Sequence, residues 1–243
     1  ADDDNLRQLK ESLSRPYVTF GLEADADYRA VEIKRYNGGN RFSIFHKEEL
    51  LGQITLRMPG RHNVANALAA VATARELEIP FKVIAEALGA FRGVGRRFEI
   101  VGEVNDILVI DDYAHHPTEI RATLATAREA YENRRIVAVF QPHLYSRTKL
   151  FAREFAEVLS AADVCILTKI YPAREAPIEG VTSELIKEEA TKLGHQQFNY
   201  VGVKVNALDE LERVAQPGDV IITIGAGSIT HIRQEILTRL SRG

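Results

Sequence analysis

The segment 111–117 gathers two carboxylates, a phenol and two imidazoles within a few positions. Such groups bind hydroxylated or cationic ligands, hold metal ions or move protons. The segment follows the apolar run Ile107–Ile110, and Pro117 suits the first turn of a helix. The cluster is therefore expected where a strand ends and a helix begins. In a structural alternative the side chains only cap that helix, and for His116 the sequence leaves both roles open.

A second polar segment follows the next apolar run, Ile136–Phe140, and reads Gln141-Pro142-His143-Leu144-Tyr145-Ser146-Arg147-Thr148. Arg147 can hold a carboxylate or a phosphate, because its guanidinium presents donors in a planar fork. The alternative is a solvated surface arginine. Two successive strands that end in His, Tyr and Arg favour a cleft shared by both segments.

Two asparagines, Asn63 and Asn66, are three positions apart in an Ala-rich and Leu-rich stretch. If a helix begins near His62, they share one face of it, and their amides can contact a purine edge. In the alternative, Asn63 caps the helix and Asn66 is a satisfied core amide; spacing alone favours that alternative.

Two glycine-containing segments are the remaining candidates for phosphate binding. One precedes Arg96 and Arg97, whose charges can meet a polyphosphate. The other, Gly225-Ala226-Gly227, lacks the full dinucleotide-binding fingerprint, so a tight strand-to-helix turn is expected there. The sequence contains no P-loop motif and no zinc-ligand spacing, and no metal ligand is assigned.

These segments are expected on an α/β fold in two parts. The first 60 residues are expected to form an antiparallel meander, with strands at 28–35, 41–45 and 52–57, before helices at 63–78 and 81–90. Beyond a linker, apolar strands alternate with amphipathic helices, which predicts a mostly parallel sheet covered on both faces. The strands are 107–110, 136–140, 164–167 and 220–224, and the helices 118–131, 147–161, 183–193, 207–214 and 229–240. Ligands bind at the carboxyl ends of such strands.

Bulk properties narrow the class of partner. The net charge of -3 over 243 residues gives no sign of a nucleic-acid or membrane partner. Cys165 is the only cysteine and cannot form an internal disulfide, which favours a reducing, cytoplasmic location. It is expected as a buried core residue. The oligomeric state is not predicted.

Taken together, the motifs resemble the Mur ligases, ATP-dependent enzymes that build the peptide stem of peptidoglycan. The resemblance covers nearly the whole chain. It rests on Gly60-x-His62-Asn63-x-x-Asn66-Ala67, Gly95-Arg96-Arg97-Phe98-Glu99 and Asp111-Asp112-Tyr113-Ala114-His115-x-Pro117. Within the family, Phe140–His143, Arg147-Thr148, Glu175–Ile178 and Gly225–Gly227 are similar to the alanine-adding member.

The resemblance implies that residues 1–91 are the C-terminal half of the family's central ATP-binding domain. Residues 92–243 would be its complete Rossmann-like C-terminal domain. The family's UDP-binding domain, P-loop and usual magnesium ligands are not among these residues, so the 243 residues alone are not expected to be active. ATP and Mg²⁺ are the implied cofactors, and UDP-N-acetylmuramate and L-alanine the implied substrates.

The resemblance also implies roles for individual residues. The adenine contacts would be Asn63 and Asn66, with His62 close by. Arg97 would approach the terminal phosphate, with Arg96 a weaker candidate, and Asp112 would accept from the ribose hydroxyls. The place of alanine would be lined by Tyr113, His115 and Arg147. Some relatives carry an arginine where this chain has Leu144, so here Arg147 is expected to hold the carboxylate alone.

The implied chemistry activates the lactyl carboxylate of the sugar as an acyl phosphate, which the amine of alanine attacks. Catalysis would be mostly positioning and charge neutralisation, with Arg97 and His115 as catalytic residues. His115 would take the ammonium proton or only bind the substrate. The alternatives are a sibling that adds a preformed peptide to the same sugar, and a non-catalytic nucleotide-binding module.

Overall fold

The computed structural model describes residues 1–10, 12–23 and 25–242. The chain divides into two compact units, Ala1–Gly93 and Val94–Gly243, and each is described by itself. The predicted boundary after residue 91 lies two positions before this division. Within the described residues, no helix is both long and apolar enough to cross a bilayer.

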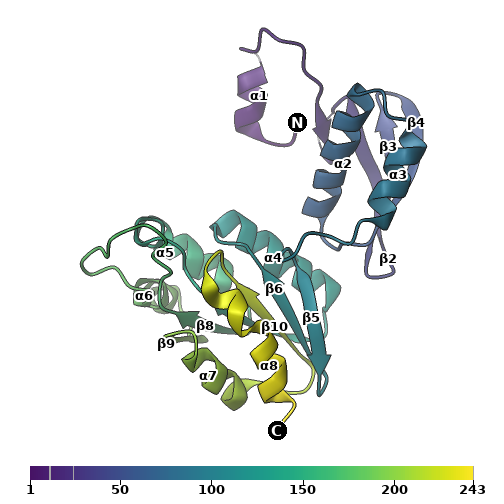
Figure 1. Cartoon of the computed structure of the whole chain (residues 1–243). Coiled ribbons are helices and arrows are strands. Elements are labelled where there is room, and N and C mark those ends of the chain that lie inside the picture. The colour runs from purple at the N-terminus through teal and green to yellow at the C-terminus, as the bar shows by residue number, and fades with distance from the viewer. Residues whose placement is uncertain (11, 24, 243) are drawn as a thin grey trace. The chain divides into compact units, whose positions relative to one another are not determined.

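The N-terminal unit is a small sheet covered on one face by helices (Figure 1). Its strands are β1 (Phe20–Gly21), β2 (Tyr28–Tyr36), β3 (Gly39–His46) and β4 (Glu49–Leu56), in that order across the sheet. Its helices are α1 (Asp4–Lys10), α2 (Arg61–Glu76) and α3 (Phe81–Ala90). Alternate residues of β2, β3 and β4 pack against one stripe of α2 and form the core of this unit. The antiparallel meander of β2, β3 and β4 is as predicted.

Helix α1 contradicts the prediction that the first 60 residues are strands. None of its seven residues is buried, but Leu6 and Leu9 are three positions apart and share one face of the helix, a helical spacing that the prediction overlooked. The short β1 pairs in parallel with β2 and extends the meander.

The C-terminal unit is built on a six-stranded sheet with the order β5-β6-β10-β7-β8-β9. The strands are β5 (Glu99–Val104), β6 (Ile107–Asp112), β7 (Arg135–Phe140), β8 (Val164–Thr168), β9 (Phe198–Gly202) and β10 (Asp219–Ile224). Only β5 pairs antiparallel, and the others are parallel. The mostly parallel sheet is therefore confirmed, and β5 and β9 are strands that the sequence did not predict.

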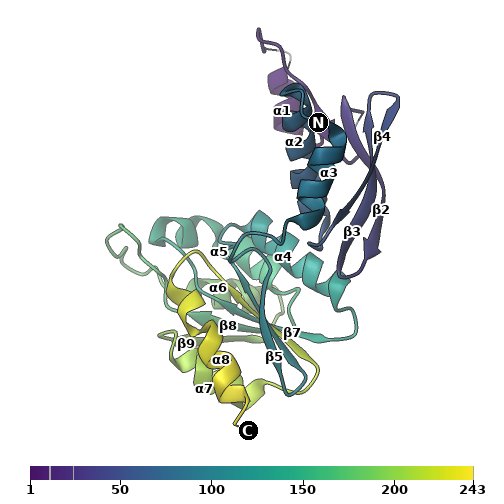
Figure 2. The same ribbon diagram turned by 45° about the vertical axis from the view of Figure 1, so that its right-hand side comes forward.

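Helices cover both faces of this sheet, as predicted (Figure 2). The helices are α4 (Pro117–Ala130), α5 (Tyr145–Leu159), α6 (Glu184–Lys192), α7 (Asn206–Val214) and α8 (Arg233–Leu240), with a 3₁₀ turn η1 at Ser228–Ile232. Residues of α4, α5 and α6 pack on one face, and residues of η1, α7 and α8 on the other. The single helix predicted over 229–240 is wrong, because η1 occupies its first part.

Candidate active site

Strand β6 ends in two buried carboxylates that have different partners. Its apolar residues are buried on both faces, and the strand continues through Asp111 and Asp112, two residues beyond the predicted end. Asp111 is fully buried and accepts hydrogen bonds from the hydroxyls of Thr223 (2.6 Å) and Thr230 (2.8 Å). Arg96 and Arg233 each place a guanidinium nitrogen 3.3 Å from it. Asp111 therefore has its hydrogen-bond and ion-pair partners inside this unit.

Asp112 shapes the loop that follows the strand. One of its oxygens accepts from the amide of Phe98 and the other from the amide of Ala114, both at 2.8 Å. Burial raises the pKa of Asp112, and these two amide hydrogen bonds offset the effect only in part. The charge of Arg97 and the hydroxyl of Thr123 also act to lower this pKa. The predicted ribose contact stays a prediction.

The start of α4 is closed by a reciprocal cap. His116 accepts from the amide of Thr118, and Glu119 accepts from the amides of His116 (3.2 Å) and His115 (2.9 Å). Burial acts to raise the pKa of Glu119, but these amides and the nearby charges of His115 and Arg97 lower it. The structure therefore places His116 in the capping role that the sequence had left open.

Arg97 projects from a segment that is fixed on both sides. Arg96 and Phe98 adopt positive φ angles of 61° and 51°, which non-glycine residues rarely do. Arg96 donates to the carbonyl of Gly225 (2.5 Å) and accepts from the amide of Tyr113 (2.7 Å). Arg97 in contrast has a side chain that is 49% exposed and a single ion pair of 3.7 Å, to Glu119. Its charge is available to a ligand, whereas that of Arg96 is engaged inside the unit.

The second polar segment contains two buried nitrogens without a hydrogen-bond partner in the described part of the chain. These are Nη1 of Arg147, in the first turn of α5, and Nδ1 of His143, just before it. Burial and the neighbouring charges of Arg147 and His115 lower the pKa of His143. A buried guanidinium nitrogen without an acceptor is costly, so this arrangement indicates an anionic ligand that the protein itself does not supply.

The residue before α5, Leu144, adopts φ 72° and ψ 135°, a conformation that costs a residue with a Cβ. It is held by an amide hydrogen bond to the carbonyl of Tyr171 (3.0 Å). Its own carbonyl accepts from the hydroxyl of Thr148 (2.8 Å). This strained residue directs the chain from the end of β7 into the helix that carries Arg147.

The two polar segments meet, although their strands are not neighbours. Strand β10 lies between β6 and β7. The ring of His115 nevertheless lies 5.3 Å from the ring of Tyr113 and 6.0 Å from that of His143. The two segments thus meet beyond the end of β10 and not at the ends of adjacent strands, and the shared cleft stays a prediction.

Two glycines in the turn after β10 allow the loops after β7 and β8 to pack closely against it. A Cβ on Gly225 would lie 2.7 Å from the carbonyl oxygen of Gln141, and one on Gly227 would lie 2.6 Å from the ring of Tyr171. Gln141 also accepts from the amide of Ile229 (2.9 Å). The turn is followed by five residues of 3₁₀ helix, which agrees with the predicted tight turn.

On the N-terminal unit, Asn63 and Asn66 line a mainly apolar cavity of about 350 Å³. Its other walls include Leu56, Met58 and Phe91. Asn63 is buried and donates to the carbonyl of Pro59 (2.7 Å), whereas Asn66 is exposed and its amide has no such bond to a described residue. An apolar cavity with two amides at its wall suits a purine base. His62 stands in the first turn of the same helix.

The predicted site residues of the C-terminal unit therefore come together: Arg96, Arg97, Asp112, Tyr113, His115 and Arg147. The predicted roles did not include Glu119, His143 or Tyr171. His143 had been noted as part of the polar segment that follows β7, but no role was given to it. Among the described residues, no three His, Cys, Asp or Glu side chains are placed to hold a metal ion.

Comparison with known proteins matches residues 96–227 to the Mur ligase glutamate ligase domain and residues 1–74 to the Mur ligase middle domain. UDP-N-acetylmuramate–L-alanine ligases from Geobacter sp. (strain M21) and Salinibacter ruber are 45% and 48% identical over 98% and 94% of this chain. The chain spans 52% and 48% of those relatives, about half their length.

Two solved structures are also similar. The UDP-N-acetylmuramate-alanine ligase from Thermotoga maritima has a TM-score of 0.75 at 32% identity, over 93% of this chain and 48% of that one. A murein peptide ligase from Psychrobacter arcticus has a TM-score of 0.68 at 28% identity, over 93% and 46%.

Proposed function

The chain belongs to the Mur ligase family, and on that premise we propose that it is the C-terminal half of an ATP-dependent ligase that joins L-alanine to UDP-N-acetylmuramate. The observation that carries the choice of substrate is the buried, unpartnered Nη1 of Arg147. Its charge acts on His143, whose ring lies 6.0 Å from that of His115 and 5.6 Å from that of Tyr171. A carboxylate of a small amino acid is an acceptor that satisfies the unpartnered nitrogen of Arg147.

In this proposal, Arg147 orients alanine through its carboxylate, and Tyr113 and His115 lie beside the amine. His143 is held toward its neutral form, so its free Nδ1 can accept a hydrogen bond from that amine. His115 then binds the amine or takes a proton from it as the new amide bond forms. Orientation of this kind accounts for much of the rate gain in ligases that join two bound substrates.

Candidate ATP contacts are proposed on each unit by itself. Asn63 and Asn66 would hold adenine at the cavity of the N-terminal unit, with His62 nearby. On the C-terminal unit, Asp112 would accept from the ribose and Arg97 would offset charge on the terminal phosphate, with Arg96 mainly holding the segment in place. No step is assigned to Mg²⁺ through residues of this chain.

The test uses a ligase of the relatives' full length that contains these 243 residues, and it measures phosphate release from ATP that depends on L-alanine. A hydrogen bond to a charged group contributes about 1.5–3 kcal/mol, so Arg147→Gln should raise the KM for L-alanine about 10- to 100-fold. The KM for ATP should change little. Arg153→Gln, an exposed arginine of the same helix, is the matched control.

Two results would contradict the proposal. One is activity with a preformed tripeptide and none with L-alanine, which would identify the peptide-adding sibling. The other is ATP binding without any phosphate release that depends on an amino acid, which would leave a nucleotide-binding module. Ligation by the isolated 243 residues would refute the view that this half alone is inactive.

A further inference from the structure

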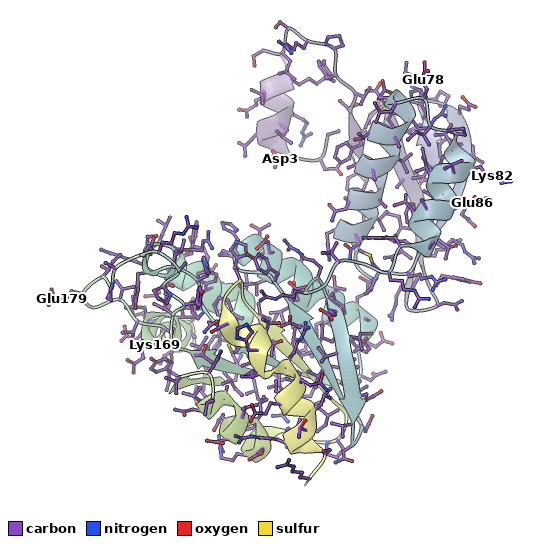
Figure 3. All side chains as sticks on the ribbon, in the orientation of Figure 1. Asp3, Glu78, Lys82, Glu86, Lys169 and Glu179 are labelled. Carbon is purple, nitrogen blue, oxygen red and sulfur yellow. The ribbon has the colours of Figure 1, made fainter. Side chains whose placement is uncertain are left out.

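The C-terminal unit contains a cavity that the proposed function does not use. It has a volume of about 310 Å³ and lies beneath the loop that joins β8 to α6, with β9 beside it. Lys169, the first residue after β8, lies near α6, and Glu179 extends from the tip of the loop away from the unit (Figure 3). The cavity is at the carboxyl ends of two parallel strands, where ligands bind in sheets of this kind. Its volume is at the lower end of the range for small-molecule sites, about 300–1,000 Å³.

Tyr145 lines this cavity with a ring that is almost completely buried. The residue is 8% exposed, and its ring packs against Ile170 and Val181. Its hydroxyl makes no hydrogen bond to any described residue, and it is not one of the described fully buried atoms that lack a partner. The hydroxyl therefore reaches the open space of the cavity, where a ligand can form a hydrogen bond with it.

Some of the other polar groups in the lining already have hydrogen-bond partners within the protein, and others do not. Ser183 donates to the carbonyl of Thr168 (2.6 Å), and the hydroxyl of Thr182 accepts from the amide of Glu184 (3.1 Å). In contrast, the ammonium of Lys169 and the hydroxyl of Tyr200 have no partner within the described residues. A cation and two phenol hydroxyls thus face the cavity without an internal role.

Charge and shape then define the ligand. Lys169 is the one charged residue of the described lining. Two nearby carboxylates are engaged or turned away: Glu175 accepts from the amide of Ser146 (3.0 Å), and Glu179 points toward solvent. A third, Glu184, accepts from the hydroxyl of Thr182 (3.5 Å), and burial together with its charge raises the pKa of Tyr200. Aliphatic side chains, Ile178 among them, form the rest of the lining. We infer that this cavity binds a small organic anion with an apolar body, namely an aromatic or branched aliphatic carboxylate. The inference does not depend on the ligase activity.

The test titrates the 243-residue chain with 3-phenylpropanoate and, separately, with its neutral amide 3-phenylpropanamide. For a ligand of this size we expect a Kd on the order of 1 mM for the acid, measured by calorimetry or NMR. The amide should bind about fivefold more weakly, and Lys169→Met should reduce the acid to the affinity of the amide. Tyr145→Phe, which removes only the hydroxyl, should weaken both ligands about fivefold.

Lys82→Met is the matched control, because Lys82 is a lysine on the surface of α3 in the other unit (Figure 3), and it should change neither Kd. If Tyr145→Phe lowers the thermal unfolding temperature, Tyr200→Phe replaces it as the hydroxyl variant. Three outcomes overturn the inference: no saturable binding, equal binding of acid and amide, or affinities that the lysine and tyrosine variants leave unchanged.

Discussion

The imidazole rings of His115 and His143 lie 6.0 Å apart in an edge-to-face arrangement, although a whole strand separates the strands that precede them. Neither ring position follows from chain order alone. The loop after β6 and the loop after β7 meet over the end of β10. This meeting brings the buried, unpartnered nitrogens of His143 and Arg147 toward the Tyr113–His115 segment. The arrangement has consequences for stability as well as for binding.

The first consequence is a dependence of stability on pH. The pKa of His143 lies below its ordinary value in the folded protein, so folding favours the neutral ring. Stability from this residue is complete above the unfolded pKa of about 6.5 and is lost as pH falls through that value toward the folded pKa. We expect His143→Gln to lose less stability than the wild type between about pH 7.5 and 5.5 in urea unfolding. His231→Gln, at an exposed histidine, should follow the wild type, and a parallel loss in both variants would disprove this role of His143.

The close approach at the turn after β10 gives a second prediction. Gly227 has φ −89°, so alanine is not excluded by its backbone conformation, but a Cβ would meet the ring of Tyr171. We expect Gly227→Ala to destabilise the C-terminal unit by about 1–3 kcal/mol, the usual cost of overpacking. At Gly95 a Cβ would make only ordinary contact, so Gly95→Ala should remain within about 0.5 kcal/mol of the wild type in the same urea measurement. Equal midpoints for the two variants would mean that the turn adjusts without cost.

Leu144 provides a test of backbone strain. At most positions alanine is more stable than glycine by about 0.5–1 kcal/mol, because glycine loses more backbone freedom on folding. At φ 72° and ψ 135° the order should reverse, so Leu144→Gly should be more stable than Leu144→Ala by about 1 kcal/mol. Both variants lose the same side chain, so the comparison isolates the Cβ. The usual order at Leu150, inside α5, serves as the control.

The sequence was sufficient for the elements whose burial leaves a continuous or periodic apolar pattern. Strand β10 is buried at every residue, and α3 was predicted with its observed bounds. Strand β9 has one fully buried residue, Phe198, and four partly buried ones, so it lacks such a signal. Edge strand β5 likewise has no buried residue. Both lie at the edges of the sheet, where one side of the strand has no neighbour.

The site was predictable as a set of residues but not as an arrangement. Chain order indicated that the segments after β6 and β7 face the same edge, yet it could not place β10 between them, because strand order depends on long-range pairing. The motif resemblance ranked Arg97 above Arg96, but it gave no physical reason for the difference. In the structure, the guanidinium of Arg96 is engaged with Gly225 and Asp111, whereas that of Arg97 is half exposed.

The buried carboxylate of Asp111 leads to a fourth prediction. It neutralises guanidinium groups of Arg96 and Arg233 while accepting from Thr223 and Thr230. Asp111→Asn keeps the shape but removes the charge, and we expect it to destabilise the C-terminal unit by about 2–4 kcal/mol, since Arg96 loses its counter-charge and Arg233 keeps only Glu99 (2.9 Å). Asp209→Asn removes an exposed carboxylate that pairs with Arg239, and it should cost less than about 1 kcal/mol. Similar urea midpoints for both variants would show that the buried network contributes little.

The two asparagines of α2 give the last prediction, because the structure assigns them different surroundings on one cavity. The amide of Asn63 already donates to the carbonyl of Pro59, whereas that of Asn66 is exposed. Asn66→Leu should therefore weaken adenosine binding about five- to tenfold, the loss of one or two hydrogen bonds, and leave the urea midpoint nearly unchanged. Asn63→Leu should weaken binding and also destabilise the N-terminal unit by about 1 kcal/mol. If adenosine binds the Asn66 variant as it binds the wild type, the cavity does not recognise the base through that amide. Stability and affinity lost together in both variants would instead indicate that α2 depends on both amides for its own packing.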